Sequence, residues 1–251
     1  MKLHHKSYGS GHPLIILHGL FGTLDNWHTM SVRLGKMFHV FAVDQRNHGR
    51  SPHSDEFNYT VMAKDLLLFM DEHRIETTHL IGHSMGGKTA MQFVKLHPER
   101  VSKLVVVDIA PRRYDAHHDH IFDTLCALDL RKHHSRASIE HELLPHFPSL
   151  PVRQFLLKNL TRDTSGPFKW KMNLPVIRKN YRCVNRAVTL SHPFDRPTLF
   201  IRGSQSSYIG GNDLKEIRRQ YLNVQFATID AGHWLHAEAP EEFFEVVEKF
   251  L

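Results

Sequence analysis

Residues 78–88 read Thr-His-Leu-Ile-Gly-His-Ser-Met-Gly-Gly-Lys, and this stretch decides the fold. It holds the pattern Gly-x-Ser-x-Gly at residues 82–86, between an apolar run and a helix-like segment at residues 85–97. A sharp turn from strand to helix presents its serine hydroxyl at the carboxyl edge of a sheet, and glycines flank it because larger side chains would collide. An inert glycine-rich turn is the alternative. The context favours Ser84 as a nucleophile, with the Met85 amide at the helix N-terminus as an oxyanion donor.

Apolar runs and helix-like pieces alternate around this stretch. Near-continuous apolar character is typical of parallel strands covered on both faces, and it occurs at residues 14–17, 38–43, 79–81, 103–109, 198–201 and 225–229. Helical spacing occurs at residues 59–73 and 241–251, the second preceded by Pro240 at its start. The alternation predicts an α/β fold with a mostly parallel central sheet, flanked by helices and joined by right-handed crossovers.

The alternation stops between residues 112 and 194. This stretch shows no good strand, whereas residues 120–130 and 152–160 are helix-like. Prolines punctuate it at Pro145, Pro148, Pro151, Pro167, Pro175 and Pro193. We therefore expect a helical cap (lid) at residues 112–194, inserted into a core formed by residues 1–111 and 195–251. Apolar cap side chains are expected mainly in the core, with some lining an acyl pocket: Phe122, Leu125, Phe147, Phe155 and Trp170.

The composition is that of an ordinary globular protein, with 251 residues, 41% of them hydrophobic and 23% charged. The two cysteines, Cys126 and Cys183, lie in no metal or redox spacing, which favours a reducing compartment and hence the cytoplasm. We recognise no signal peptide and no run long enough to span a membrane. The net charge of +6 is scattered, without the basic run of a nucleic-acid-binding protein. It suggests instead an attraction for small anionic substrates.

Two further motifs follow apolar runs. His18-Gly-Leu-Phe-Gly22 follows the first run directly, and its backbone could approach the nucleophile, which makes the Leu20 amide the second expected oxyanion donor. Residues 230–236 read Asp-Ala-Gly-His-Trp-Leu-His and follow the last run. A histidine in such a place is usually structural or solvated, and the chain contains 22 of them.

Five motifs together resemble the α/β-hydrolase superfamily, in particular the small bacterial esterases of the YbfF type. They are HGLFG, DQRNHGRSP, GHSMGGK, VVVDIAP and AGHWLHAE, which begin at residues 18, 44, 82, 105 and 231. The resemblance implies a hydrolase core with a helical lid that hydrolyses acyl esters or thioesters without a cofactor. It also implies the chain order serine, acid, histidine. That order selects His233 as the general base and leaves His236 as the runner-up, expected at the surface or in packing.

The acid departs from the commonest pattern of that superfamily. The usual aspartate closes a Gly-x-x-Asp turn after the penultimate strand, but residues 203–206 read Gly-Ser-Gln-Ser. Asp108 follows the strand after the elbow helix, keeps the chain order and resembles the YbfF-type arrangement. We therefore predict Asp108 as the residue that orients His233, although a strand-end cap is its alternative role. Ser206 is a candidate accessory member, and Asp213 is a poorer candidate for the acid.

Two polar motifs are expected not to react. Residues 44–51 end a strand and are expected to brace the loop at residues 18–22. Residues 115–120 read Asp-Ala-His-His-Asp-His, which nearly matches the HxHxDH spacing of dinuclear metallohydrolases but begins with aspartate. We expect solvated polar residues at the cap entry and no metal site there.

The expected mechanism is a two-step acyl transfer on a small-molecule ester or thioester. Ser84 attacks the acyl carbon while His233 takes its proton, and water then releases the acid. Two alternatives stay open. The same core supports lyases and thioesterases of menaquinone or aromatic-degradation pathways. Some hydrolase folds are non-catalytic binding modules, which usually lack the serine or the histidine.

Overall fold

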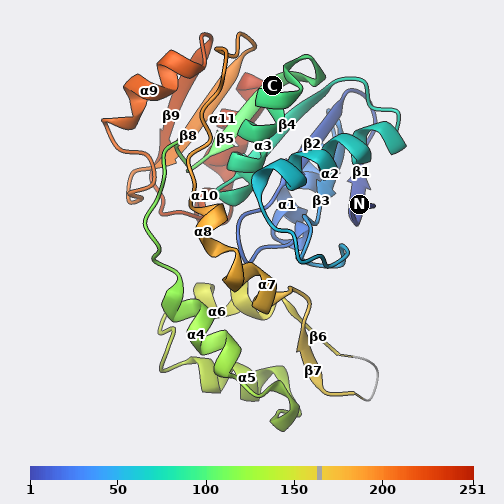
Figure 1. Cartoon of the computed structure of the whole chain (residues 1–251), viewed down its shortest axis with the longest axis vertical. Helices are drawn as coiled ribbons and strands as arrows, with labels where there is room; N and C mark the ends of the chain where they lie inside the picture. The colour runs from blue at the N-terminus through green and yellow to red at the C-terminus, as the bar shows by residue number, and fades with distance from the viewer. Residues whose placement is uncertain (163–165) are drawn as a thin grey trace.

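The computed structural model of the chain describes residues 1–162 and 166–251 (Figure 1). Its main sheet has seven strands in the order β1-β3-β2-β4-β5-β8-β9. These strands are β1 (His5–Tyr8), β2 (Pro13–Leu17), β3 (His39–Val43), β4 (Thr78–His83), β5 (Val101–Val107), β8 (Thr198–Gly203) and β9 (Val224–Ile229). All neighbours run parallel except β1 and β3. The predicted α/β fold with a mostly parallel sheet is confirmed.

Helices cover both faces of this sheet. They are α1 (His28–Leu34), α2 (Tyr59–Glu72), α3 (Met85–Leu96), α9 (Asp213–Gln220), α10 (Leu235–Glu238) and α11 (Pro240–Phe250), with short 3-10 helices at Leu24–Trp27 and Pro98–Arg100. A third 3-10 helix, Leu130–Lys132, lies in the insertion described next. Alternate residues of β2 enter two different apolar clusters. Ile15 and Leu17 pack with residues of α2 and α3, whereas Leu14 and Ile16 pack with residues of α1 and α11. The near-continuous apolar run therefore reflects a strand buried on both faces.

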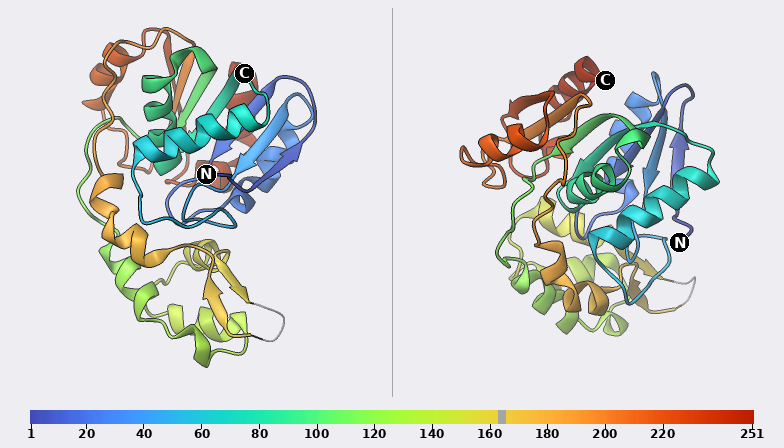
Figure 2. Two further views of the ribbon diagram at one scale, coloured as in Figure 1. Left: turned by 45° about the vertical axis from the view of Figure 1, so that its right-hand side comes forward. Right: turned by 45° about the horizontal axis from the view of Figure 1, so that its top comes forward.

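The insertion between β5 and β8 forms a layer of its own at one end of the sheet (Figures 1 and 2). It contains α4 (Asp119–Ala127), α5 (Arg136–Leu143), α6 (Leu150–Leu157), α7 (Leu174–Lys179) and α8 (Tyr181–Val184). The chain enters this insertion from the carboxyl end of β5. The cap therefore lies over the carboxyl edge of the sheet, where Ser84 follows β4. The predicted bounds of residues 112–194 enclose all five helices.

The prediction of no strand in this insertion was wrong. β6 (Leu160–Arg162) and β7 (Phe168–Trp170) pair antiparallel, with Leu160 opposite Trp170. Each strand has three residues, which is too short for an alternating pattern to stand out in the sequence. The edge strand β1 was also missed, because its sequence His-Lys-Ser-Tyr contains no apolar run.

The apolar side chains of the cap lie mainly in the core. Phe122 and Leu125 are each 1% exposed, and Phe147 is also buried. Phe155 packs against Trp234, with ring centroids 5.3 Å apart. Cys126 and Cys183 are both free. None of the helices in residues 1–162 and 166–251 combines the length and apolar character that crossing a membrane requires.

Candidate active site

Ser84 lies on a strained turn between β4 and α3. Its backbone has φ 52° and ψ −116°, in the left-handed half of conformational space that side chains rarely adopt. A Cβ atom on Gly82 would lie 2.3 Å from the Gly86 oxygen, and one on Gly86 would lie 2.3 Å from the Leu17 oxygen. Both glycines are therefore required by close backbone approach, as the sequence predicted. The Ser84 N–H donates to the Val107 oxygen at 2.9 Å, which ties the turn to the end of β5.

The loop after β2 lies against this turn. A Cβ atom on Gly19 would lie 3.3 Å from the Ser84 Cβ and 2.9 Å from the His83 Nδ1, so only glycine lets the loop come this near. Leu20 and Met85 line the same pocket as Ser84. In the described part of the chain, neither of their backbone N–H groups has an acceptor. Two free donors beside the serine hydroxyl are what an oxyanion site needs.

His18 holds this loop in place. Its Nδ1 donates to the Gly19 oxygen at 2.8 Å, and its Nε2 accepts the Gln45 N–H at 3.0 Å. Complete burial lowers the pKa of His18 to about 4, so the imidazole is neutral and can both donate and accept. The Gln45 amide in turn donates to the His18 oxygen at 2.7 Å. These contacts fit the expectation that residues 44–51 brace the loop.

Asp108 and His233 are brought together across the carboxyl edge of the sheet. The His233 Nδ1 lies 2.7 Å from the Asp108 Oδ2. The carboxylate is fully buried and also accepts the Gly203 N–H at 3.1 Å on Oδ1 and the Ser206 hydroxyl on Oδ2. Asp108 has φ 49°, so this backbone, like that of Ser84, is held in a strained conformation at the end of a strand. Ser206 therefore lies where a fourth hydrogen-bonding member would act.

Two contacts hold His233, one on its backbone and one on its ring. The His83 Nε2 donates to the His233 carbonyl at 2.8 Å, and burial keeps the His83 pKa well below its usual value. The Tyr208 ring stacks on the His233 ring, with centroids 4.0 Å apart and planes 19° apart. Among the described residues the Ser84 hydroxyl has no hydrogen-bond partner. Catalytic hydrogen bonds are often long without substrate and shorten in the Michaelis complex.

The runner-up residues lie elsewhere. His236 is buried and stacks on Trp27, with centroids 4.1 Å apart and planes 5° apart, so it is a packing residue. Asp213 accepts the Gly210 N–H at 2.8 Å and pairs with the Arg112 guanidinium at 3.0 Å. The carboxylate that contacts His233 is that of Asp108.

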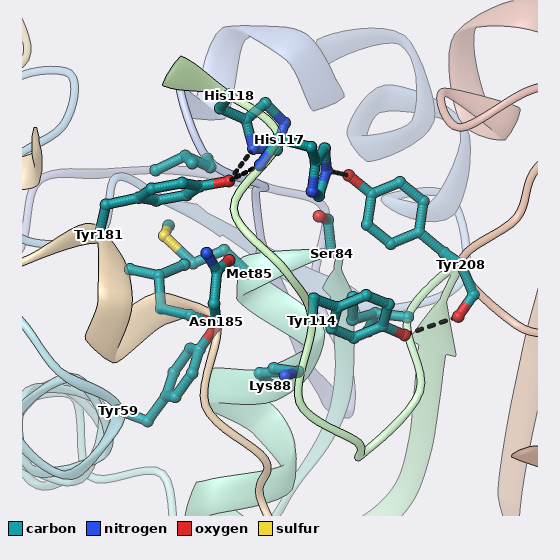
Figure 3. Close-up of a pocket in the computed structure, with 13 residues that line it drawn as sticks. Tyr59, Ser84, Met85, Lys88, Tyr114, His117, His118, Tyr181, Asn185 and Tyr208 are labelled. Atoms are coloured by element: carbon teal, nitrogen blue, oxygen red, sulfur yellow. Dashed lines mark hydrogen bonds between the residues drawn. The ribbon is translucent and has the colours of Figure 1, made fainter. Parts of the chain in front are cut away.

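A narrow pocket opens beside Ser84, between the core and the two segments around Arg112 and Arg186 that connect the core to the cap, called the cap connectors below (Figure 3). Most of its polar lining was missed in the sequence: Tyr59, Lys88, Tyr114, His117, His118, Tyr181, Asn185 and Tyr208. The expectation of solvated histidines at the cap entry was wrong for His118. Its Nδ1 lies 2.5 Å from the Tyr181 hydroxyl, and burial lowers its pKa to about 3. The His117 Nε2 lies 2.6 Å from the Tyr208 hydroxyl.

Comparison with known proteins agrees with this arrangement. A sequence model of the alpha/beta hydrolase fold family matches residues 12–240. The chain is 36% identical to the sn-1-specific diacylglycerol lipase ABHD11 of Danio rerio, over 97% of this chain and 79% of that protein. It is 34% identical to the esterase YbfF of Escherichia coli, over 95% of this chain and 92% of that protein.

A solved structure described as a marine microorganism esterase is similar with a TM-score of 0.97 and 41% identity, covering 100% of this chain and 99% of that one. The relatives are named as esterases and lipases, which confirms the predicted enzyme class, a carboxylic ester hydrolase. The family match over most of the chain, the parallel sheet and the strained serine turn all agree. The chain belongs to the α/β-hydrolase family.

Proposed function

We propose that this enzyme hydrolyses small acyl esters through Ser84, His233 and Asp108. The observation that carries the proposal is the 2.7 Å contact between the Asp108 carboxylate and the His233 Nδ1, beside the turn that holds Ser84. A carboxylate there keeps the proton on Nδ1 and leaves Nε2 free to accept a proton. The same carboxylate stabilises the imidazolium that then forms.

The reaction would proceed in two balanced steps. Ser84 Oγ bonds to the acyl carbon as His233 Nε2 takes the hydroxyl proton, and the Leu20 and Met85 amides donate to the oxyanion. The C–O bond to the leaving alcohol breaks, and His233 gives that alcohol the proton. Water then attacks the acyl-enzyme with His233 again as base, which releases the acid and restores Ser84. Acyl thioesters would pass through the same intermediates, with a thiol as the leaving group.

The test is the Ser84→Ala variant assayed with p-nitrophenyl butyrate and labelled with a fluorophosphonate probe. Hydrolysis and labelling should both be lost while the melting temperature stays within a few degrees of wild type. Ser191→Ala, at an exposed position, is the matched control and should behave as wild type. Labelling of another serine in Ser84→Ala would refute the assignment. Parallel assays with butyryl-CoA would decide whether a thiol leaving group is accepted.

A further inference from the structure

The pocket beside Ser84 contains a buried cation without an acidic partner. Lys88 lines it and is 1% exposed. The described lining of the pocket holds tyrosines, histidines and one asparagine, but no aspartate or glutamate. In the described part of the chain, no carboxylate forms an ion pair with Lys88. An unpaired charge is costly to bury, so such a group favours an anionic ligand.

Hydrogen bonds hold the Lys88 ammonium in place. Its Nζ donates to the Arg112 oxygen at 2.7 Å and to the Arg186 oxygen at 2.6 Å. The ammonium also lies 4.7 Å from the centroid of the Tyr114 ring. An ammonium has three N–H donors, and two are used by these carbonyls. The third has no acceptor among the described residues, and Figure 3 shows the side chain at one end of the pocket.

Arg112, which is paired with Asp213, packs beside Lys88. The Arg112 guanidinium lies on the same Tyr114 ring, 4.0 Å from its centroid. Burial, with a smaller contribution from Arg112, lowers the pKa of Lys88 to about 7. That shift is the mark of a cation that lacks a counter-ion, because a nearby carboxylate would raise the pKa instead.

The inference assigns this pocket to the acyl side of the scissile bond. The leaving group must be near His233, because His233 protonates it. His233 is not among the described residues that line the pocket, whereas Leu20 and Met85, which carry the oxyanion donors, are. In this assignment the acyl chain enters the pocket towards Lys88.

We propose that Lys88 binds a carboxylate at the far end of the acyl group, so that the preferred substrates are monoesters of short dicarboxylic acids. This inference rests on the proposed function. Lys88 is one helical turn beyond Ser84, and its N–H donates to the Ser84 oxygen at 3.1 Å. Four residues of α-helix advance only about 6 Å, so Lys88 and Ser84 are close enough for a short acyl chain to join them.

The experiment compares substrates that differ only in that carboxylate. Monoethyl succinate, glutarate and adipate are assayed in a pH-stat against ethyl butanoate, pentanoate and hexanoate, which have the same acyl carbon counts. Wild-type enzyme should show a kcat/KM at least about tenfold higher for the best monoester than for its neutral counterpart, as expected of a charged hydrogen bond. Equal or lower values for all three monoesters would overturn the proposal, even if the neutral esters are hydrolysed well. Failure to hydrolyse any ester would instead contradict the proposed function.

The Lys88→Met variant distinguishes two roles of Lys88, binding of a substrate carboxylate and structural support of the cap. Lys88 bridges the two cap connectors, so its loss could lower activity on every substrate. A purely structural role would reduce both kcat/KM values together and keep their ratio. We expect the monoester-to-alkanoate ratio to fall at least about tenfold. An unchanged ratio would overturn the proposal. Lys95→Met, at an exposed position on the same helix, is the matched control and should keep the wild-type ratio. If Lys88→Met does not fold, the wild-type substrate comparison still decides.

Discussion

Asp108→Asn tests the catalytic assignment because the structure dictates how the new amide must sit. The Oδ1 position accepts the Gly203 N–H at 3.1 Å, so the asparagine has to place its carbonyl oxygen there. Its NH₂ group then occupies the Oδ2 position, 2.7 Å from the His233 Nδ1. Nδ1 must become the acceptor, and the ring proton moves to Nε2. His233 can then no longer take the Ser84 proton.

The expected loss follows from the wrong tautomer and the missing charge together. In a hydrolase that works through such a triad, this exchange lowers kcat by about 10⁴-fold, which corresponds to about 5.4 kcal/mol of transition-state stabilisation. Ser206→Ala removes one donor to the carboxylate but leaves the tautomer intact. Its loss should be about tenfold, or about 1.4 kcal/mol. Ser206→Asp in the Asp108→Asn background should restore part of the activity, since Ser206 contacts the same oxygen position.

The assay is steady-state hydrolysis of p-nitrophenyl butyrate, with the melting temperature as a control for folding. An Asp108→Asn enzyme that folds normally and retains kcat within tenfold of wild type would refute the role of Asp108. A Ser206→Ala enzyme impaired more than Asp108→Asn would refute the ranking of the two residues.

Two further predictions concern the buried histidines and the cap. Acidification from pH 7 to 5.5 should lower the free energy of unfolding by about 1.3 kcal/mol for each buried neutral histidine, or by about 5 kcal/mol for four of them. The reason is that the unfolded chain binds protons that the folded chain cannot bind. The contribution of these histidines to stability is therefore fully present only above about pH 6.5. Burial lowers the pKa of all four, namely His18, His48, His83 and His236. The His236→Phe variant, which keeps the stack on Trp27, should reduce the loss in urea titrations by about 1.3 kcal/mol, and an unaltered pH dependence would contradict this account. Tyr181→Ala, which enlarges the pocket from the cap side, should shift the preference towards longer acyl chains in a graded ester series. Leu144→Ala, at an exposed cap position, is its control, and matching chain-length profiles for the two variants would exclude the cap as a specificity element.

The fold of the hydrolase core could be predicted from local patterns in the sequence. The elbow was predictable because glycines 82 and 86 and the flanking apolar run are all within one short stretch, and backbone approach requires them. The bounds of the buried strands were also nearly correct, since burial on both faces demands continuous apolar residues. Strands such as β1 and β6, which form by hydrogen bonding to a neighbouring strand and are not buried on both faces, have no continuous apolar run in the sequence.

The polar lining of the pocket could not be predicted in the same way. Lys88 was visible within a quoted motif, but its burial depends on carbonyls at residues 112 and 186, far away along the chain. Tyr208 is two residues beyond Ser206, and only the folded structure shows its stack on His233. His118 was misjudged because a polar string is normally solvated, whereas here Tyr181 covers it. These roles arise from tertiary contacts between distant segments.

The two hydrogen bonds from Lys88 to the cap connectors have a mechanical consequence. A lid attached through two independent strands of chain can both tilt and twist relative to the body beneath it. Here one ammonium joins the two connectors at the Arg112 and Arg186 carbonyls, so their positions are coupled to each other. A displacement of either connector therefore has to move, or break its hydrogen bond to, the ammonium that lines the pocket beside Ser84.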